Sequence, residues 1–158
     1  QFAQAMNAEV YVTSSSKEKL QQAKNLGARD GVLYTDEDWS KALQQKVPEG
    51  FDVIIDSAGG EGFGDLVKLL GMGGRVVFFG GTRGRWPSIL PQYLFFKQVS
   101  LLASTMGSPL EFKEMCAFVS KHSIEPVVDS IFPLKDALKS MDRLLHQDRF
   151  GKVILQTD

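Results

Sequence analysis

The chain has 158 residues, of which 43% are hydrophobic and 23% are charged, and its formal net charge is -1. This length corresponds to one ordinary domain with a single core. The balanced charge argues against nucleic acid as a partner, and no apolar run approaches the roughly 20 residues that cross a bilayer, which argues against a membrane. The lone cysteine, Cys116, cannot form an intramolecular disulfide, which fits a cytoplasmic location.

Strand signals recur along the chain, and helical or irregular connections separate the first five of them. They fall at residues 9–13, 31–34, 51–56, 75–80, 99–104, 127–132 and 152–156. Strands that alternate with helices indicate βαβ units and a parallel, doubly wound sheet. The segments "DVIID" and "RVVFF" are nearly all apolar, as is typical of strands covered on both faces.

The expected helices begin and end at residues that favour helix termini. Ser15 and Glu18 have capping-box spacing ahead of a run that Gly27 ends. Ser108 and Pro109 suit the cap and first position of a later helix. That helix and a last one, at about residues 135–146, each carry an apolar stripe that we expect to be buried. The stripes are Phe112, Met115, Cys116 and Val119, and Ala137, Leu138, Met141, Leu144 and Leu145.

The first residues, "QFAQAM", read as the middle of a helix with no cap before it. In a doubly wound fold such a helix follows a first strand and a Gly-rich turn that brings phosphate to the helix N-terminus. Neither element precedes Glu9, and the glycine cluster at residues 59–64 is only a weak indication of phosphate binding. We therefore expect the chain to be the C-terminal part of a longer protein, whose first strand would be central in the sheet.

The sequence resembles the medium-chain dehydrogenase/reductase superfamily, which includes zinc-type alcohol dehydrogenases and quinone oxidoreductases. The matching runs, in the order typical of the family, are "VYVTSSSKEKLQQAKNLGA", "GFDVIIDSAGG", "LGMGGRVVFFGGTRG", "FFKQVSLLASTMGSPLEF" and "FGKVILQ". The resemblance implies an α/β fold, with a Rossmann-like doubly wound parallel sheet over residues 1–103 that lacks its first strand and Gly-rich turn. It also implies that residues 104–158 return to a GroES-like catalytic domain.

The same resemblance implies a set of cofactor contacts. Ser14, followed by Ser15 and Ser16, stands where an acidic residue commonly binds the ribose, while Lys19 and Tyr34 match contacts to the adenosine ribose or its 2′-phosphate. The remaining implied contacts lie beside the riboses (Ser57, Ala58, Gly59), near the nicotinamide (Phe79, Gly80, Gly81), at the carboxamide (Ser104, Met106) and toward the pyrophosphate (Lys152).

The serine-rich corner predicts which dinucleotide is bound. A carboxylate at position 14 would accept hydrogen bonds from ribose hydroxyls and repel a 2′-phosphate, whereas the hydroxyls of Ser14 and Ser16 can donate to that phosphate. Lys17 or Lys19 can neutralise its charge. We therefore expect NADP(H) rather than NAD(H).

Each of these positions also has a simpler interpretation. Residues 14–16 can serve as turn and cap residues, and the nearby lysines as solvated helix charges. Phe79 can belong to the core, Gly80 and Gly81 can permit a tight strand exit, and Lys152 can be a surface charge.

No catalytic acid, base or metal ligand can be assigned from these residues. His122 and His146 fall near helix ends without cysteine or carboxylate partners at metal-ligand spacing. The resemblance places the zinc ligands, or their replacements, before Gln1, so zinc dependence is undetermined. The serine corner and the "DSAGG" loop favour the zinc-independent, quinone oxidoreductase-like branch.

We therefore expect an NADP(H)-dependent oxidoreductase that transfers a hydride between the nicotinamide and a small carbonyl, enone or quinone substrate. The residues present here would be inactive alone. The alternatives are a zinc-dependent alcohol dehydrogenase, a noncatalytic NADPH-binding or redox-sensing module and, less well supported, a Rossmann-like methyltransferase. The resemblance also places the strand at 99–104 on a sheet edge that pairs with its twin, which implies a homodimer.

Overall fold

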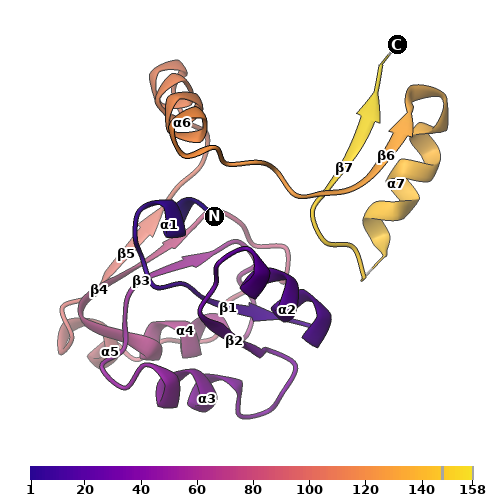
Figure 1. Ribbon diagram of the computed structural model, residues 1–158. Helices are drawn as coiled ribbons and strands as arrows, with labels where there is room; N and C mark the ends of the chain where they lie inside the picture. The colour runs from indigo at the N-terminus through magenta and orange to yellow at the C-terminus, as the bar shows by residue number, and fades with distance from the viewer. Residues whose placement is uncertain (147, 158) are drawn as a thin grey trace. The chain divides into compact units, whose positions relative to one another are not determined.

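The computed structural model describes residues 1–146 and 148–157, which form two compact units (Figure 1). One unit is Glu9–Ser108, and the other combines Gln1–Ala8 with Pro109–Asp158. The sequence pattern changes near residues 103–105, a few residues before the boundary between the units. The assignment of residues 104–158 to a catalytic domain stays a prediction.

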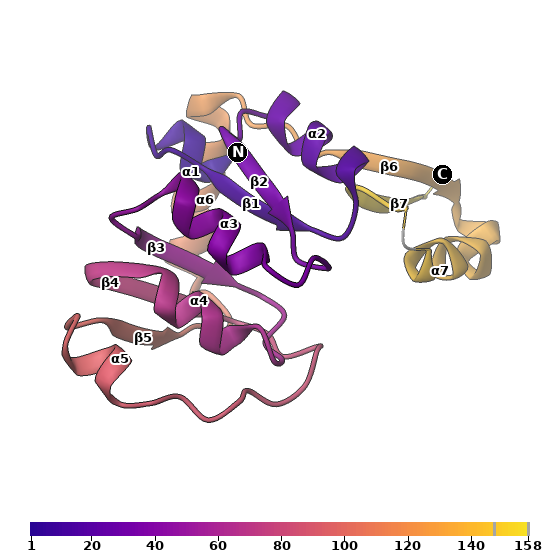
Figure 2. The ribbon, with the colours of Figure 1, turned by 90° about the horizontal axis from the view of Figure 1, so that it is seen from below.

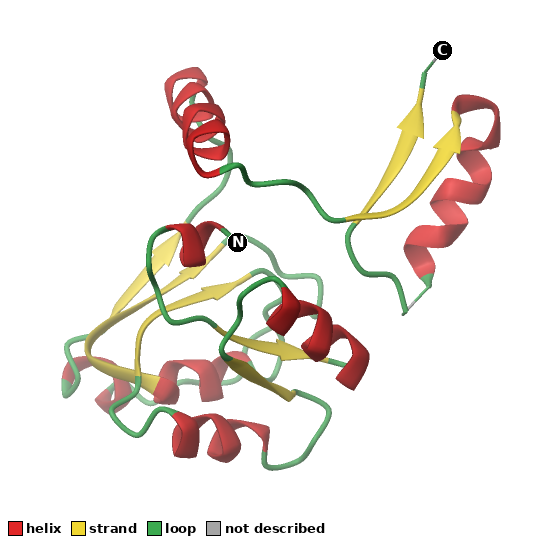
Figure 3. Ribbon diagram, viewed as in Figure 1, coloured by secondary structure: helices red, strands yellow, loops and turns green. Residues whose placement is uncertain are grey.

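The unit Glu9–Ser108 consists of parallel strands that alternate with helices, as Figures 2 and 3 show. Strands β1 (Tyr11–Ser14) and β2 (Asp30–Leu33) form one parallel pair, and α2 (Lys17–Asn25) connects them. The second sheet has the order β3-β4-β5, and all its pairs are parallel. Its strands are β3 (Phe51–Asp56), β4 (Leu70–Phe78) and β5 (Ser100–Ala103). The prediction of a Rossmann-like α/β fold is confirmed, with the strands divided between two sheets.

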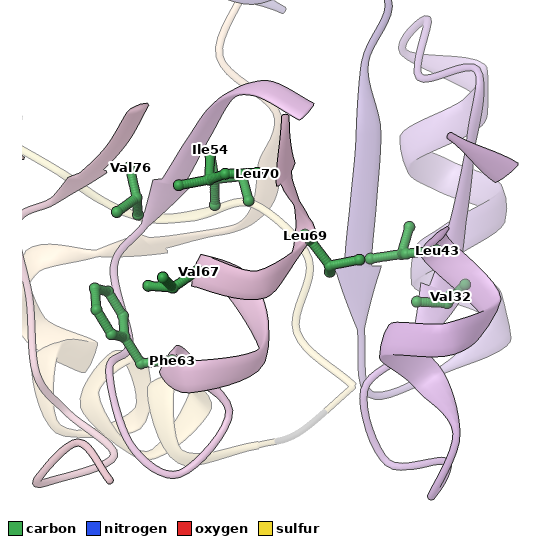
Figure 4. Close-up of a cluster of buried hydrophobic side chains, with 8 residues drawn as sticks. All are labelled: Val32, Leu43, Ile54, Phe63, Val67, Leu69, Leu70 and Val76. Atoms are coloured by element: carbon green, nitrogen blue, oxygen red, sulfur yellow. The ribbon is translucent and has the colours of Figure 1, made fainter. Parts of the chain in front are cut away.

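Helices α3 (Trp39–Lys46), α4 (Phe63–Leu69) and α5 (Gln92–Phe95) make the connections to and within the second sheet. The apolar side chains of α3 and α4 meet those of β2, β3 and β4 in one buried cluster, drawn in Figure 4. This core holds the strand ends, and therefore the loops that follow them, in fixed positions. Its members are Val32, Leu43, Ile54, Phe63, Val67, Leu69, Leu70 and Val76.

The other unit contains α1 (Phe2–Ala5), α6 (Pro109–His122) and a β6-α7-β7 segment. Strands β6 (Val128–Pro133) and β7 (Lys152–Gln156) pair in parallel, and between them lie a 3-10 turn, Leu134–Asp136, and α7 (Ala137–Leu145). An ion pair joins the helix to the strand, because Arg143 donates from Nε and Nη2 to both carboxylate oxygens of Asp129 at 2.7 Å.

The strand boundaries agree closely with the sequence prediction in some places and differ in others. Strands β3 and β7 span the predicted residues, whereas β4 begins at Leu70 rather than at residue 75. The early part of β4, "LGMGG", is rich in glycine, which has a low strand propensity, and it lies where the β3–β4 register shifts. Helix α2 is capped by Ser16, one residue later than the predicted cap at Ser15.

The prediction that the stripes of α6 and α7 are buried is wrong for the described residues. On α7, Leu138 is 82% exposed and Leu145 is 80% exposed, while Met141 and Leu144 are also exposed. On α6, Phe112, Met115 and Cys116 are exposed. On α6, Phe118 stacks on Phe2 of α1 with ring centroids 5.6 Å apart, and Val119 is half-buried, but this contact leaves the other stripe residues of the helix exposed.

The prediction that β3 is covered on both faces is also wrong for the described residues. Ile54 is buried, but its neighbours Val53 and Ile55, which point to the opposite face, are 47% and 66% exposed. Helices α3 and α4 cover only the face that carries Ile54.

Candidate cofactor-binding site

The loops that leave the carboxyl ends of the strands meet at one edge of the unit Glu9–Ser108. The backbone N–H of Tyr34, just after β2, donates to the carbonyl of Ser14 at the end of β1, at 3.0 Å. The loops after β3 and β4 are joined in the same way, because the Arg83 N–H donates to the carbonyl of Ala58 at 2.9 Å. Ligands of open α/β sheets bind at this edge.

The serine corner consists of Ser14, Ser15 and Ser16, and one of these residues has a structural role. Ser16 caps α2, because its Oγ accepts a hydrogen bond from the Lys19 N–H at 3.2 Å. The simpler interpretation of Ser16 as a cap residue is therefore confirmed. Ser14 is half-buried at the end of β1, and Ser15 is exposed.

Glu18 follows the cap in the first turn of α2. Its own backbone N–H, and then the Ser16 hydroxyl, hold the pKa of the Glu18 carboxyl below its usual value. The carboxylate therefore stays ionised beside the helix N-terminus, where negative charge is stabilised.

Arg83 brings a positive charge to this corner, which the sequence interpretation missed. Its guanidinium carbon lies 4.7 Å from the centroid of the Tyr34 ring, a cation–π contact between the loops after β4 and β2. The added Cβ of any residue at Gly60 would come within 2.8 Å of the Arg83 Cβ, so the loop after β3 also packs closely against Arg83.

The loop Ser57–Gly59 after β3 takes its shape from the preceding aspartate. Asp56 is buried, and its carboxylate accepts hydrogen bonds from the N–H groups of Ala58 and Gly59 at 3.2 and 2.8 Å. Gly59 has a φ of +67°, which a residue with a Cβ rarely adopts. The sequence marked this loop as a ribose contact but did not identify Asp56 as the residue that fixes it.

The two glycines after β4 have different roles. A Cβ at Gly80 would lie 2.2 Å from the carbonyl oxygen of Ser57, so only glycine permits this close approach of the two loops. A Cβ at Gly81 would meet no atom within 4 Å. The interpretation of a tight strand exit is therefore confirmed for Gly80, whereas Gly81 faces open space.

A cavity of about 440 Å³ opens beside these glycines. The end of β5 closes one side, where the Ser104 N–H donates to the carbonyl of Phe78 at 2.9 Å. The cavity brings together four residues that were predicted to contact the nicotinamide or its carboxamide. They are Phe79, Gly80, Gly81 and Ser104. The complete lining is Phe78, Phe79, Gly80, Gly81, Gly84, Arg85, Trp86, Ala103 and Ser104.

Two predicted contacts lie neither in this cavity nor in the loops and the serine corner described above. Met106 is 90% exposed and does not line it. Lys152 begins β7 in the other unit, where it is exposed. The cofactor roles of these two residues, like those of the other predicted contacts, stay predictions.

The described part of the chain was also searched for side chains that could bind a metal ion. Within residues 1–146 and 148–157, no group of three or more His, Cys, Asp or Glu side chains could hold a metal ion. The described helices also include none that is long and apolar enough to span a membrane.

Residues 1–121 match the family model described as zinc-binding dehydrogenase. The chain belongs to the zinc-binding dehydrogenase family. The family carries zinc in its name, but the described residues of this chain do not include a donor set that fits the metal.

Known proteins and solved structures also match almost the whole chain. The zinc-type alcohol dehydrogenase-like protein YogA of Leptosphaeria maculans is 36% identical over 98% of this chain and 46% of its own length. The quinone oxidoreductase of Mus musculus is 28% identical over 98% of the chain and 49% of its own length. A crystal structure of an NAD-dependent alcohol dehydrogenase superposes with a TM-score of 0.88 at 33% identity, over 99% of this chain and 46% of that one. The chain thus spans about half the length of these relatives.

Proposed function

We propose that the protein carrying this chain is an NADP(H)-dependent oxidoreductase that acts on a carbonyl, enone or quinone. Membership of the zinc-binding dehydrogenase family supports the oxidoreductase class. The observation that carries the preference for NADP(H) is the contact between Arg83 and Tyr34, which adds a guanidinium to a corner without an acidic ribose-binding residue.

The residues of the corner fit a phosphate group for three reasons. The half-buried Ser14 hydroxyl can donate a hydrogen bond, as can the Tyr34 hydroxyl. Positive charge is available from two elements, with Lys19 in the first turn of α2 and Arg83 in the loop after β4. Guanidinium groups bind phosphate oxygens through paired N–H donors, and such charge-assisted bonds are about twice as strong as neutral ones.

The cavity beside Gly81 fits the other end of a dinucleotide. Gly80 brings the loops after β3 and β4 together, and Gly81 leaves space at the strand exit. When bound, a nicotinamide supplies or accepts the hydride. The part of the lining formed by Phe79, Gly80 and Gly81 would orient its ring and exclude water from one side.

The test is the dissociation constants of NADPH and NADH for the full-length protein, its Arg83→Gln variant and its Lys19→Ala variant. We expect the wild type to prefer NADPH, and each variant to lose about 10-fold in NADPH affinity while NADH affinity changes little. Arg29→Gln is a matched control, because Arg29 pairs with Glu9 on the surface. Equal wild-type affinity for both cofactors would defeat the proposal.

Turnover separates an enzyme from a noncatalytic NADPH-binding or redox-sensing module. We expect oxidation of NADPH by the full-length protein with at least one member of a panel of quinones, enones and aldehydes. Binding of NADPH with no oxidation across the panel would favour the noncatalytic module.

A zinc-dependent alcohol dehydrogenase is the second candidate, because the relative with 36% identity is named a zinc-type alcohol dehydrogenase-like protein. Metal analysis of the purified full-length protein discriminates between the two. Stoichiometric zinc, together with alcohol oxidation that a chelator abolishes, would favour this second candidate.

We also propose a homodimer that forms through β5. This strand ends the order β3-β4-β5, and its residues Leu101 and Leu102 are 37% and 45% exposed. An apolar edge strand is usually covered, and pairing with a second copy is one way to cover it. Sedimentation of the full-length protein as a monomer would contradict this proposal.

A further inference from the structure

The cavity beside Gly81 has one rigid aromatic wall. The Trp86 indole stacks on Phe63 with ring centroids 3.8 Å apart and planes 4° apart, and it meets the edge of Phe78 at 4.7 Å. Phe63 is fully buried, so the indole is held against the core. An apolar or aromatic ligand entering the cavity therefore meets a surface that does not have to reorder.

Arg85 is the one charged residue of this lining. The remaining lining residues are glycines, aromatic residues, Ala103 and Ser104, so no carboxylate in the lining offsets the guanidinium. The salt bridges formed within residues 1–146 and 148–157 do not include Arg85. The cavity therefore presents a cation without a partner beside an apolar wall.

We propose that the part of this cavity lined by Arg85 and Trp86, beside the nicotinamide, selects aryl carbonyl substrates that carry a carboxylate. Arg85 would bind the carboxylate, and Trp86 would contact the apolar part of the substrate. This inference rests on the proposed function, because it assumes that the nicotinamide lies beside Phe79, Gly80 and Gly81. A carboxylate suits the site because a guanidinium donates to both of its oxygens at once.

The reaction at such a substrate is a two-electron reduction. A hydride from NADPH forms the new C–H bond at the carbonyl carbon, the C=O π bond breaks, and a proton derived from water completes the hydroxyl. The products are the hydroxy acid and NADP⁺. Arg85 binds the substrate in this account and does not transfer the proton.

The experiment compares 4-formylbenzoate with its neutral methyl ester as substrates of the full-length protein at saturating NADPH. We expect the wild type to have the lower KM for 4-formylbenzoate. The Arg85→Gln variant should raise that KM by about 10-fold, as expected for loss of one charge-assisted pair, and leave the KM of the ester unchanged. Arg85→Lys should restore part of the preference, because it keeps the charge.

Arg83→Gln is the matched control, since it removes an arginine from the same loop. Arg83→Gln should weaken NADPH binding and leave the preference for the carboxylate intact. Arg85→Gln should leave NADPH binding unchanged and remove the preference for the carboxylate. Binding of both aldehydes to the NADP⁺-loaded and cofactor-free protein, measured by calorimetry, covers the case in which neither is reduced.

Three results would overturn the inference. The first is that the wild type has equal KM or binding values for the two aldehydes. The second is that Arg85→Gln changes the values for both aldehydes equally, and the third is that this variant loses NADPH affinity. The last result would mean that Arg85 contacts the cofactor. Failure of the wild type to bind NADPH would instead count against the proposed function.

Discussion

Both compact units contain helices with an apolar face, but the two units differ in how far that face is buried. In the unit Glu9–Ser108, helices α3 and α4 bury their apolar residues against the strands, and the buried apolar residues of the described chain all lie there. In the other unit, α6 and α7 also carry apolar stripes, but most of the stripe residues are exposed. A helical period therefore identifies the apolar face, but burial also requires a surface to pack against.

The largest expected effect comes from truncating the same residue type in each unit. Leu69 on α4 is 3% exposed, whereas Leu145 on α7 is 80% exposed. We expect Leu69→Ala to lower the free energy of unfolding of the 158-residue chain by about 2–5 kcal/mol, because it leaves a cavity. Leu145→Ala should change it by less than about 0.5 kcal/mol. Urea denaturation measures both, and equal losses would show that α7 is packed as firmly as α4.

An ion pair, rather than an apolar core, joins α7 to β6. Arg143, which binds both oxygens of Asp129, is the main cause that holds the pKa of this carboxyl well below its usual range. Because the folded pKa is the lower one, the stabilisation is present above the unfolded pKa of about 3.9 and is lost as the pH falls through the folded value.

We therefore expect the backbone amides of β6 and α7 to lose protection from hydrogen exchange at strongly acidic pH. Their exchange, measured relative to that of β3 and β4, should be faster there than at pH 7. Asp129→Asn should raise the exchange of β6 and α7 already at pH 7 and reduce its dependence on acid. Exchange that stays the same in the variant at pH 7 would contradict a stabilising role for the pair.

The smallest effect concerns the two neighbouring serines at the start of α2. Ser16→Ala removes the bond from its Oγ to the Lys19 N–H and should lower the free energy of unfolding by about 1 kcal/mol. Ser15→Ala is the control, because Ser15 is exposed and is not the cap residue. Thermal unfolding of both variants tests this, and a larger loss for Ser15→Ala would place the cap where the sequence had predicted it.

The sequence predicted best what local chemistry determines. The runs "FDVIID" and "KVILQ" have enough strand-forming residues to mark β3 and β7 to the residue. The start of β4 could not be recognised because its glycines resemble a loop. The predicted N-cap of α2 was wrong by one residue because three consecutive serines, Ser14, Ser15 and Ser16, are equally suitable in type. Only the backbone geometry selects Ser16.

The candidate site was predicted in part, because the chain order of the strands indicates which loops share an edge. The end of β1 at Ser14 does contact Tyr34, and the loop that contains Ala58 contacts the one that contains Gly80. The contact between Arg83 and Tyr34 joins these two pairs of segments. Arg83 was missed because its contact with Tyr34 joins residues far apart in the sequence. Its position in "GGTRG", directly after the glycine exit of β4, was the available signal.

The central claim is that the corner formed by Ser14, Lys19, Tyr34 and Arg83 binds a 2′-phosphate. The most direct measurement is the ratio of the dissociation constants of NADH and NADPH in the full-length wild type and in its Ser14→Asp variant. We predict a wild-type ratio of about 10 or more, which falls to about 1 or below when a carboxylate repels the phosphate. A wild-type ratio near 1, or a ratio that Ser14→Asp leaves unchanged, would contradict the claim.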